Sequence, residues 1–181
     1  MRRRGTGLDV MLVAAGFVAV VMLCAVLAWA NWPTERLGTG TRADLVVVRK
    51  SARVLELYQA DSLLKSYAVS LGSDPLGPKR AEGDGRTPEG TYVLDYRKSD
   101  SSFHRALHIS YPSASDTAQA TANGLNPGGS IMVHGLPNGL GFLGRLHRYF
   151  DWTEGCVAVT NREIEEIWAA VADGTRIRVE P

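Results

Sequence analysis

The chain has 181 residues, with 20 Lys or Arg against 19 Asp or Glu, and its formal net charge at pH 7 is +1. Three of the basic residues and one of the acidic residues lie in positions 1–9, which leaves 17 basic and 18 acidic residues for the rest of the chain. This balance contains no basic stripe and argues against nucleic acid as a partner.

The N-terminal segment consists of a short basic head and a long apolar run. Arg2, Arg3 and Arg4 precede residues 10–30, a run of 21 positions without a charged side chain. A helix of that length is about 30 Å long, which matches the hydrocarbon core of a bilayer. The arginines place residues 1–9 in the cytoplasm and the rest of the chain on the outer, periplasmic side of the cytoplasmic membrane.

A cleaved signal sequence is the alternative for this run, because Ala28-Trp29-Ala30 is an A-x-A-like cleavage site. The apolar core of a signal peptide is usually only about 7–15 residues long, which favours an uncleaved single-pass transmembrane anchor. Cleavage after Ala30 would instead release a periplasmic form. In both cases the rest of the chain is exported.

Residues 31–42 are rich in Pro, Gly and Thr and are predicted to be a linker. Residues 43–181 then suit a single domain with its own hydrophobic core. Cys156 is the one cysteine of this domain, since Cys24 lies in the apolar run. An exported thiol without a partner for a disulfide is either a reactive group or an accident of composition.

The first part of this domain alternates β-branched and apolar residues. Residues 44–49, 54–58 and 63–70 are predicted to form a three-strand meander. Residues 72–90 are a long Gly- and Pro-rich loop, and loops of that length are usually functional or mobile. We expect further strands at residues 91–96, 104–110 and 130–133, and a short helix at residues 114–122.

A helix is predicted directly after Cys156. Thr160 and Glu163 form a capping box, or Asn161 caps the helix directly. Its buried face consists of Ile164, Ile167, Trp168 and Val171. Gly174 is expected to end this helix, before a closing strand at residues 175–179. Short strands with one clear helix indicate a mainly β domain of the α+β class.

Cys156 and His134 are the candidate catalytic residues. A cysteine thiolate can attack an acyl carbon, while a histidine removes the thiol proton and returns it to the leaving amine. Gly155, directly before the cysteine, leaves room for a substrate carbonyl and presents a backbone N–H to an oxyanion. A buried structural thiol is the competing interpretation from spacing alone.

Four sequence blocks carry a resemblance that supports catalysis. They are GDGRTPEGTY at residues 83–92, LHISYP at 107–112, IMVHG at 131–135 and WTEGCVAVTN at 152–161. Together they resemble the catalytic domain of the L,D-transpeptidases (YkuD type), and most closely its YafK-like branch, over roughly residues 45–179. The resemblance implies a β-sandwich of mixed sheets with Cys156 and His134 at a cleft. It also implies that the Gly135 carbonyl or a nearby group orients the far imidazole nitrogen.

Two positions depart from the usual YkuD-type pattern. Glu154 stands two residues before Cys156, where that pattern has a second histidine, and Ala158 stands two residues after it, in place of Arg or Asn. We expect the Glu154 carboxylate to raise the pKa of the thiol. Both departures bear on substrate choice.

Further substrate-binding residues are expected next to the cysteine. Trp152 and Thr153 belong to the resembling block, and His147 precedes it in a flanking loop. Arg145 and Arg148 are interpreted either as a solvated face or as a clamp for a substrate carboxylate.

No metal and no cofactor are expected. His104 and His108 are four residues apart, but on a strand such positions lie about 13 Å from each other. No Cys or carboxylate cluster nearby completes a zinc site.

The resemblance implies an L,D-transpeptidase that forms a thioester with a tetrapeptide stem of peptidoglycan and transfers it to an amine. The acceptor would be a second stem or a lipoprotein. A cysteine hydrolase on the same scaffold, which trims stems or releases tethered protein, is the first alternative. A peptidoglycan-binding module without catalysis is the second, although it would require neither Cys156 nor His134.

Overall fold

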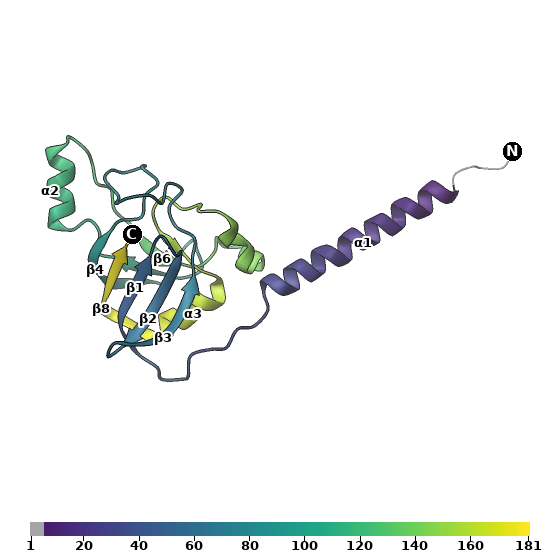
Figure 1. Ribbon diagram of the computed structural model, residues 1–181, viewed down its shortest axis with the longest axis horizontal. Coiled ribbons are helices and arrows are strands. Elements are labelled where there is room, and N and C mark those ends of the chain that lie inside the picture. Colours follow the sequence, from purple (N-terminus) through teal and green to yellow (C-terminus); the bar gives the residue numbers. More distant parts are fainter. Residues whose placement is uncertain (1–5) are drawn as a thin grey trace.

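The computed structural model describes residues 6–181, so Arg2, Arg3 and Arg4 lie outside the described part of the chain. Helix α1 (Thr6–Ala30) projects away from a compact β domain (Figure 1). Within it, Val10–Ala30 has a mean hydropathy of 2.9 and is long and apolar enough to cross a membrane.

Eight strands form one mixed sheet in the order β3-β2-β1-β8-β4-β5-β6-β7. Their bounds are β1 Ala43–Arg49, β2 Val54–Gln59, β3 Ser62–Ala68, β4 Gly90–Lys98, β5 Ala106–Ile109, β6 Met132–His134, β7 Val157–Ala158 and β8 Val171–Glu180. The antiparallel pairs β1–β2 and β2–β3 confirm the predicted meander. Strand β8 runs parallel to β1 and antiparallel to β4, and so joins the meander to the strands that carry the site.

The sheet curls until its two edges meet. Ser70, just after β3, forms an antiparallel bridge with Ala158 of β7, and Gly72 bridges Thr153. The buried apolar side chains of both halves face each other across one core, which includes Val46, Leu57, Leu94, Ile109, Val133 and Ile177. The expected mainly β fold is therefore confirmed, with its two facing layers belonging to one continuous sheet.

Two α-helices pack on the domain. Helix α2 (Ala114–Ala122) has the bounds that the sequence predicts, and its N-terminus is closed by a capping box from Ser113. Helix α3 (Asn161–Ala170) begins with the predicted capping box of Thr160 and Glu163. It ends before Gly174, contrary to expectation, because Val171 pairs with Ala43 of β1 and starts β8.

Other bounds also differ from the predictions. Strand β5 starts at Ala106 because His104 has a positive φ of 66°, which takes it out of the extended conformation.

Residues 72–90 form an ordered loop that two buried lysines hold in place. Lys79 pairs with Asp84 at 2.8 Å, and Lys50 pairs with Glu89 at 2.7 Å and donates to the Thr87 carbonyl at 3.0 Å.

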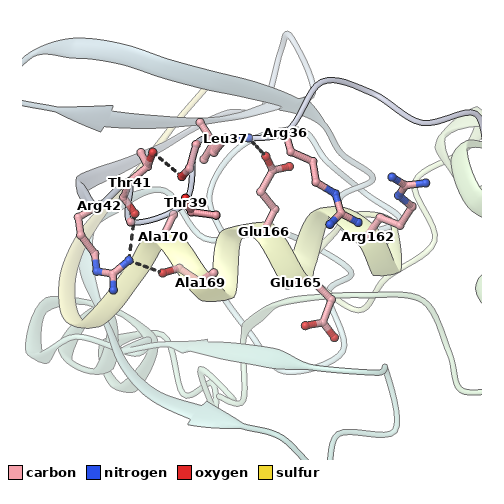
Figure 2. Close-up of a pocket in the computed structure, with 12 residues that line it drawn as sticks. Arg36, Leu37, Thr39, Thr41, Arg42, Arg162, Glu165, Glu166, Ala169 and Ala170 are labelled. Carbon is pink, nitrogen blue, oxygen red and sulfur yellow. Dashed lines mark hydrogen bonds between the residues drawn. The ribbon is translucent and has the colours of Figure 1, made fainter.

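The linker is packed against the domain. Glu166 of α3 accepts a hydrogen bond from the Leu37 N–H, and Arg42 donates to the carbonyl of Ala169 at 3.0 Å (Figure 2). Lys65 of β3 binds the carbonyl of Glu35 and the carboxylate of Glu166. Residues 31–42 therefore follow the surface of α3 instead of extending freely.

Candidate active site

Strands β6 and β7 bring the cysteine and the histidine to one face of the sheet. Val133 pairs with Val157 in a parallel ladder, so Cys156 lies opposite Met132. His134 is two residues beyond Met132 on β6, and alternate residues of a strand share a face. Cys156 and His134 therefore lie on the same face of the sheet, where both line one cleft.

The sulfur of Cys156 is held by the backbone around β6. It accepts a hydrogen bond from the Met132 N–H at 3.4 Å, and the thiol faces the Ser130 carbonyl at 3.7 Å. Gly155 precedes it with φ 121°, and a Cβ at this position would lie 2.4 Å from the Arg86 carbonyl oxygen. The positive φ and the close approach of the Arg86 carbonyl each require glycine at this position. The sharp turn before the cysteine thus depends on Gly155.

Thr153 closes the same turn. Its hydroxyl donates to the Cys156 carbonyl at 2.7 Å and accepts from the Gly155 N–H at 3.2 Å. Its backbone also pairs with Leu71 and Ser73, which ties the turn to the chain after β3. Thr153 therefore shapes the turn that precedes Cys156.

His134 is buried, and its tautomer is set by the backbone. Nδ1 lies 2.7 Å from the Gly135 carbonyl oxygen, which can only accept, so Nδ1 carries the proton and donates. The lone pair of Nε2 is then available as a base. The ring centroids of Phe103 and Trp152 lie 4.5 and 5.8 Å from that of the imidazole. Burial lowers the pKa of His134 to about 4.

Burial raises the pKa of the Cys156 thiol, whereas the Met132 N–H and the positive charge of Lys79 lower it. The expected cause, the Glu154 carboxylate, is not what raises this pKa, because Glu154 is exposed to solvent. Sequence reasoning also missed Lys79, since this buried lysine comes from the long loop and only the fold brings it near the thiol.

Cys156 and His134 line one cleft of about 370 Å³, together with Trp152, Thr153 and Glu154. The cleft has further lining residues that the sequence did not indicate. They are Lys98, Ser101, Ser102, Phe103, Ala106, Ser130 and Met132. Met132 lies inside the resembling block next to Val133, so strand alternation could have identified it. The others come from β4, β5, the connection between these two strands and, for Ser130, the segment just before β6.

Arg145, His147 and Arg148 are not among the residues that line this cleft. They lie in η1 (Gly141–Tyr149), which consists of two short 3₁₀ helices joined by a kink at Gly144, where the sequence suggested a loop. Arg145 donates to the Trp32 carbonyl at 2.9 Å, and Arg148 binds both oxygens of Glu163 at 2.6 Å. The sequence left a solvated face and a substrate clamp open for these arginines, and in this structure they contact the linker and the start of α3.

His147 lies behind Trp152 instead of in the cleft. Its Nδ1 is 3.1 Å from the Ser70 hydroxyl and accepts a 3.5 Å hydrogen bond from the Trp152 indole N–H. Burial, and then the charge of Arg148, lower the pKa of His147 to about 4. Its contacts support Trp152, which does line the cleft.

The other two histidines lie apart and face carboxylates. His104 is 2.7 Å from Glu165 of α3, and His108 is 2.7 Å from Asp95 of β4. His108 also stacks on Tyr96 at 4.4 Å.

Residues 43–179 match the L,D-transpeptidase catalytic domain family (YkuD). The chain belongs to this family. YafK of Escherichia coli (strain K12) is 32% identical over 132 residues, which cover 70% of this chain and 46% of YafK. The chain thus spans about half the length of the curated relatives that it matches.

Solved structures confirm the L,D-transpeptidase fold. The helical cell shape determining protein Pgp2 from Campylobacter jejuni matches with a TM-score of 0.59 and 24% identity, over 86% of this chain and 54% of Pgp2. An L,D-transpeptidase from Mycobacterium smegmatis matches with a TM-score of 0.50 and 18% identity, over 77% of this chain and 59% of that protein.

Proposed function

We propose that the chain is a peptidoglycan L,D-transpeptidase with Cys156 as its nucleophile. The sulfur would attack the carbonyl carbon between the L-centre of a diaminopimelate and the terminal D-Ala of a tetrapeptide stem. A C–S bond forms, the C–N bond breaks, and D-Ala leaves as an amine. An acceptor amine on a second stem or a lipoprotein then attacks the thioester and returns the thiol. The observation that carries this proposal is the shared cleft of Cys156 and His134.

His134 is the proposed general base and acid. Its Nδ1–H is fixed on the Gly135 carbonyl, which leaves Nε2 to take the thiol proton and to return it to the leaving D-Ala nitrogen. Burial disfavours both the thiolate and the imidazolium, so the resting pair is neutral. Proton transfer then accompanies attack on the substrate.

The oxyanion would be stabilised by the backbone at the turn that precedes Cys156. The N–H of Gly155 already donates to Thr153, and that of Gly135 donates to Phe103 and Arg105. The N–H of Cys156 has no acceptor among the described residues, and it adjoins the sulfur. We assign it as the oxyanion donor, with Gly155 and Gly135 as orienting residues.

The cleft suits a substrate with both signs of charge. Its charged lining residues within the described chain are Lys98 and Glu154. A diaminopimelate side chain carries a carboxylate and an ammonium group, which these two residues would complement. Trp152 and Thr153 complete the proposed substrate-binding set.

Reaction products test the proposal. The purified chain is incubated with disaccharide-tetrapeptides, and the products are identified by mass spectrometry. We expect cross-linked dimers and free D-Ala, and neither with the Cys156→Ser variant as control. Shortened monomers alone would indicate the hydrolase instead. Unchanged substrate, with the wild-type chain folded, would overturn catalysis on this substrate and leave a binding module.

We further propose that α1 is a retained single-span anchor in the cytoplasmic membrane, with the catalytic domain on the periplasmic side. The 21 apolar residues Val10–Ala30 support this proposal. The test is the intact mass of the chain from membranes washed with high salt. A mature chain that begins at Asn31, or recovery in the soluble fraction, would overturn the anchor.

A further inference from the structure

The domain end of α1 is fixed against η1. Asn31 Nδ2 donates to the carbonyls of Leu27 and Phe142 at 2.8 and 2.7 Å, and Arg145 binds the Trp32 carbonyl at 2.9 Å. A Cβ on Gly144 would lie 2.4 Å from the Ala30 carbonyl oxygen, so only glycine permits this approach. In Figure 1, η1 is the green helical segment beside the end of α1.

Large apolar side chains gather at this junction. Leu140, Phe142, Tyr149 and Phe150 are 41, 55, 72 and 66% exposed, and Trp29 and Trp32 are 52 and 69% exposed. We call these six residues the η1 surface. An apolar groove of about 460 Å³ lies in the same region, and it is lined by leucines of η1 together with Trp152. Soluble surfaces rarely leave so many clustered apolar side chains in water without a binding role.

We propose that the η1 surface is seated in the headgroup layer of the bilayer that α1 spans, which rests on the proposed membrane anchor. The apolar span ends at Ala30, beside η1, so an embedded α1 brings η1 to the level of the membrane surface. Trp and Tyr favour that layer because their rings are apolar at one end and polar at the other. Leucine and phenylalanine side chains beside arginines are typical of elements that lie on a membrane.

The bilayer fits this surface better than a protein partner does. The surface is continuous with α1, whose side chains are exposed from Val10 to Val26, so one lipid phase covers both. The packed linker supports this arrangement, because Leu37 and Arg42 are bound to α3 and hold the domain close to α1.

The orientation has a consequence for catalysis. Trp152 lines both the apolar groove and the cleft of Cys156. A membrane-seated η1 surface would therefore hold the cleft beside the lipid headgroups, where the most membrane-proximal stems are. A linker of 12 extended residues would otherwise allow a reach of roughly 40 Å.

Photo-crosslinking of the full chain tests this orientation. p-Benzoylphenylalanine is placed at Tyr149, at Val21 in the middle of α1, or at Tyr96, a 45% exposed residue of β4. Each chain is reconstituted in vesicles of phosphatidylethanolamine and phosphatidylglycerol that carry an alkyne-labelled lipid. We expect lipid adducts at Val21 and Tyr149 that are at least several-fold above those at Tyr96.

The outcomes separate the orientation from the anchor. If position 21 forms lipid adducts but position 149 forms no more than position 96, the membrane-seated surface is overturned and the anchor stays in place. Adducts from Tyr149 to a second copy of the chain, in place of lipid, would overturn it in the same way. Loss of labelling at Val21 would overturn the anchor and the orientation together.

Discussion

At the scale of residues, Cys156 and His134 form a pair that is neutral at rest. The imidazole has a pKa of about 4 because Phe103 and Trp152 exclude water from it, and burial raises the pKa of the thiol. An imidazolium–thiolate pair, in contrast, is charged before the substrate arrives. Under the proposed mechanism, the neutral pair would keep the thiol unreactive until an acyl group is bound.

The Cys156→Ser variant should fold normally and lose turnover by at least about 10³-fold, because the neutral base is too weak to activate a serine hydroxyl. Product formation from disaccharide-tetrapeptides, together with the thermal unfolding curve, checks this outcome. Near-normal turnover would remove Cys156 from the mechanism.

The neutral pair also predicts the pH dependence of thiol alkylation. In the substrate-free chain, the rate of iodoacetamide reaction at Cys156 should keep rising through the alkaline range, because the thiol pKa is raised. Intact-mass time courses measure this rate. The His134→Gln variant should keep the alkaline reactivity and lose turnover. A rate that is already maximal at neutral pH would indicate a preformed ion pair.

At the scale of elements, one ion pair joins η1 to the start of α3. Arg148 of η1 binds both carboxylate oxygens of Glu163, which in turn accepts from the backbone N–H and hydroxyl of Thr160. This pair, with the bonds from Thr160, keeps the pKa of Glu163 low despite its burial. The pair therefore anchors the start of the helix that directly follows the Cys156 strand.

The Arg148→Met variant should lower the free energy of unfolding by about 2 kcal/mol, because it leaves a largely buried carboxylate without its partner. The KM for the tetrapeptide should stay unchanged, since Arg148 is not in the cleft. Urea unfolding and steady-state kinetics measure the two effects. Arg178→Met is the matched control, as its pair with Glu180 is exposed. A raised KM without loss of stability would support the interpretation of Arg148 as part of a substrate clamp.

At the scale of the whole molecule, two buried histidines link stability to pH. His134 and His147 have pKa values of about 4 in the folded chain, against an ordinary value of 6.5. Below pH 6.5 the unfolded chain binds protons that the folded chain does not, so acidification favours unfolding. The stability that depends on these two neutral imidazoles is complete above pH 6.5 and is lost as the pH falls toward 4.

We expect the free energy of unfolding to fall by about 2 kcal/mol per histidine between pH 7 and pH 5. Urea unfolding of the detergent-solubilised chain, followed by near-UV circular dichroism, measures this slope. The His147→Gln variant should remove about half of it. A flat profile over this range would show that the two imidazoles are not shielded from water.

Local patterns were enough to predict helix α2, the start of α3 and the first strands. The bounds of α2, the capping box of Thr160 and Glu163, and the meander of β1 to β3 depend on residues that are near in sequence. The choice of Cys156 and His134 as candidates also came from sequence, because few residue types perform this chemistry and the flanking blocks resemble a known family.

The tertiary structure decided the features that depend on distant partners. Helix α3 stops at Ala170 because Val171 pairs with Ala43 of β1, more than a hundred residues away in sequence. The local sequence shows only a helical period at this point. Strand β7 has two residues, too few to show any period, and exists because Val133 lies beside it. The role of Arg148, the packed linker and the charge of Lys79 near the thiol likewise follow from contacts between segments that only folding brings together.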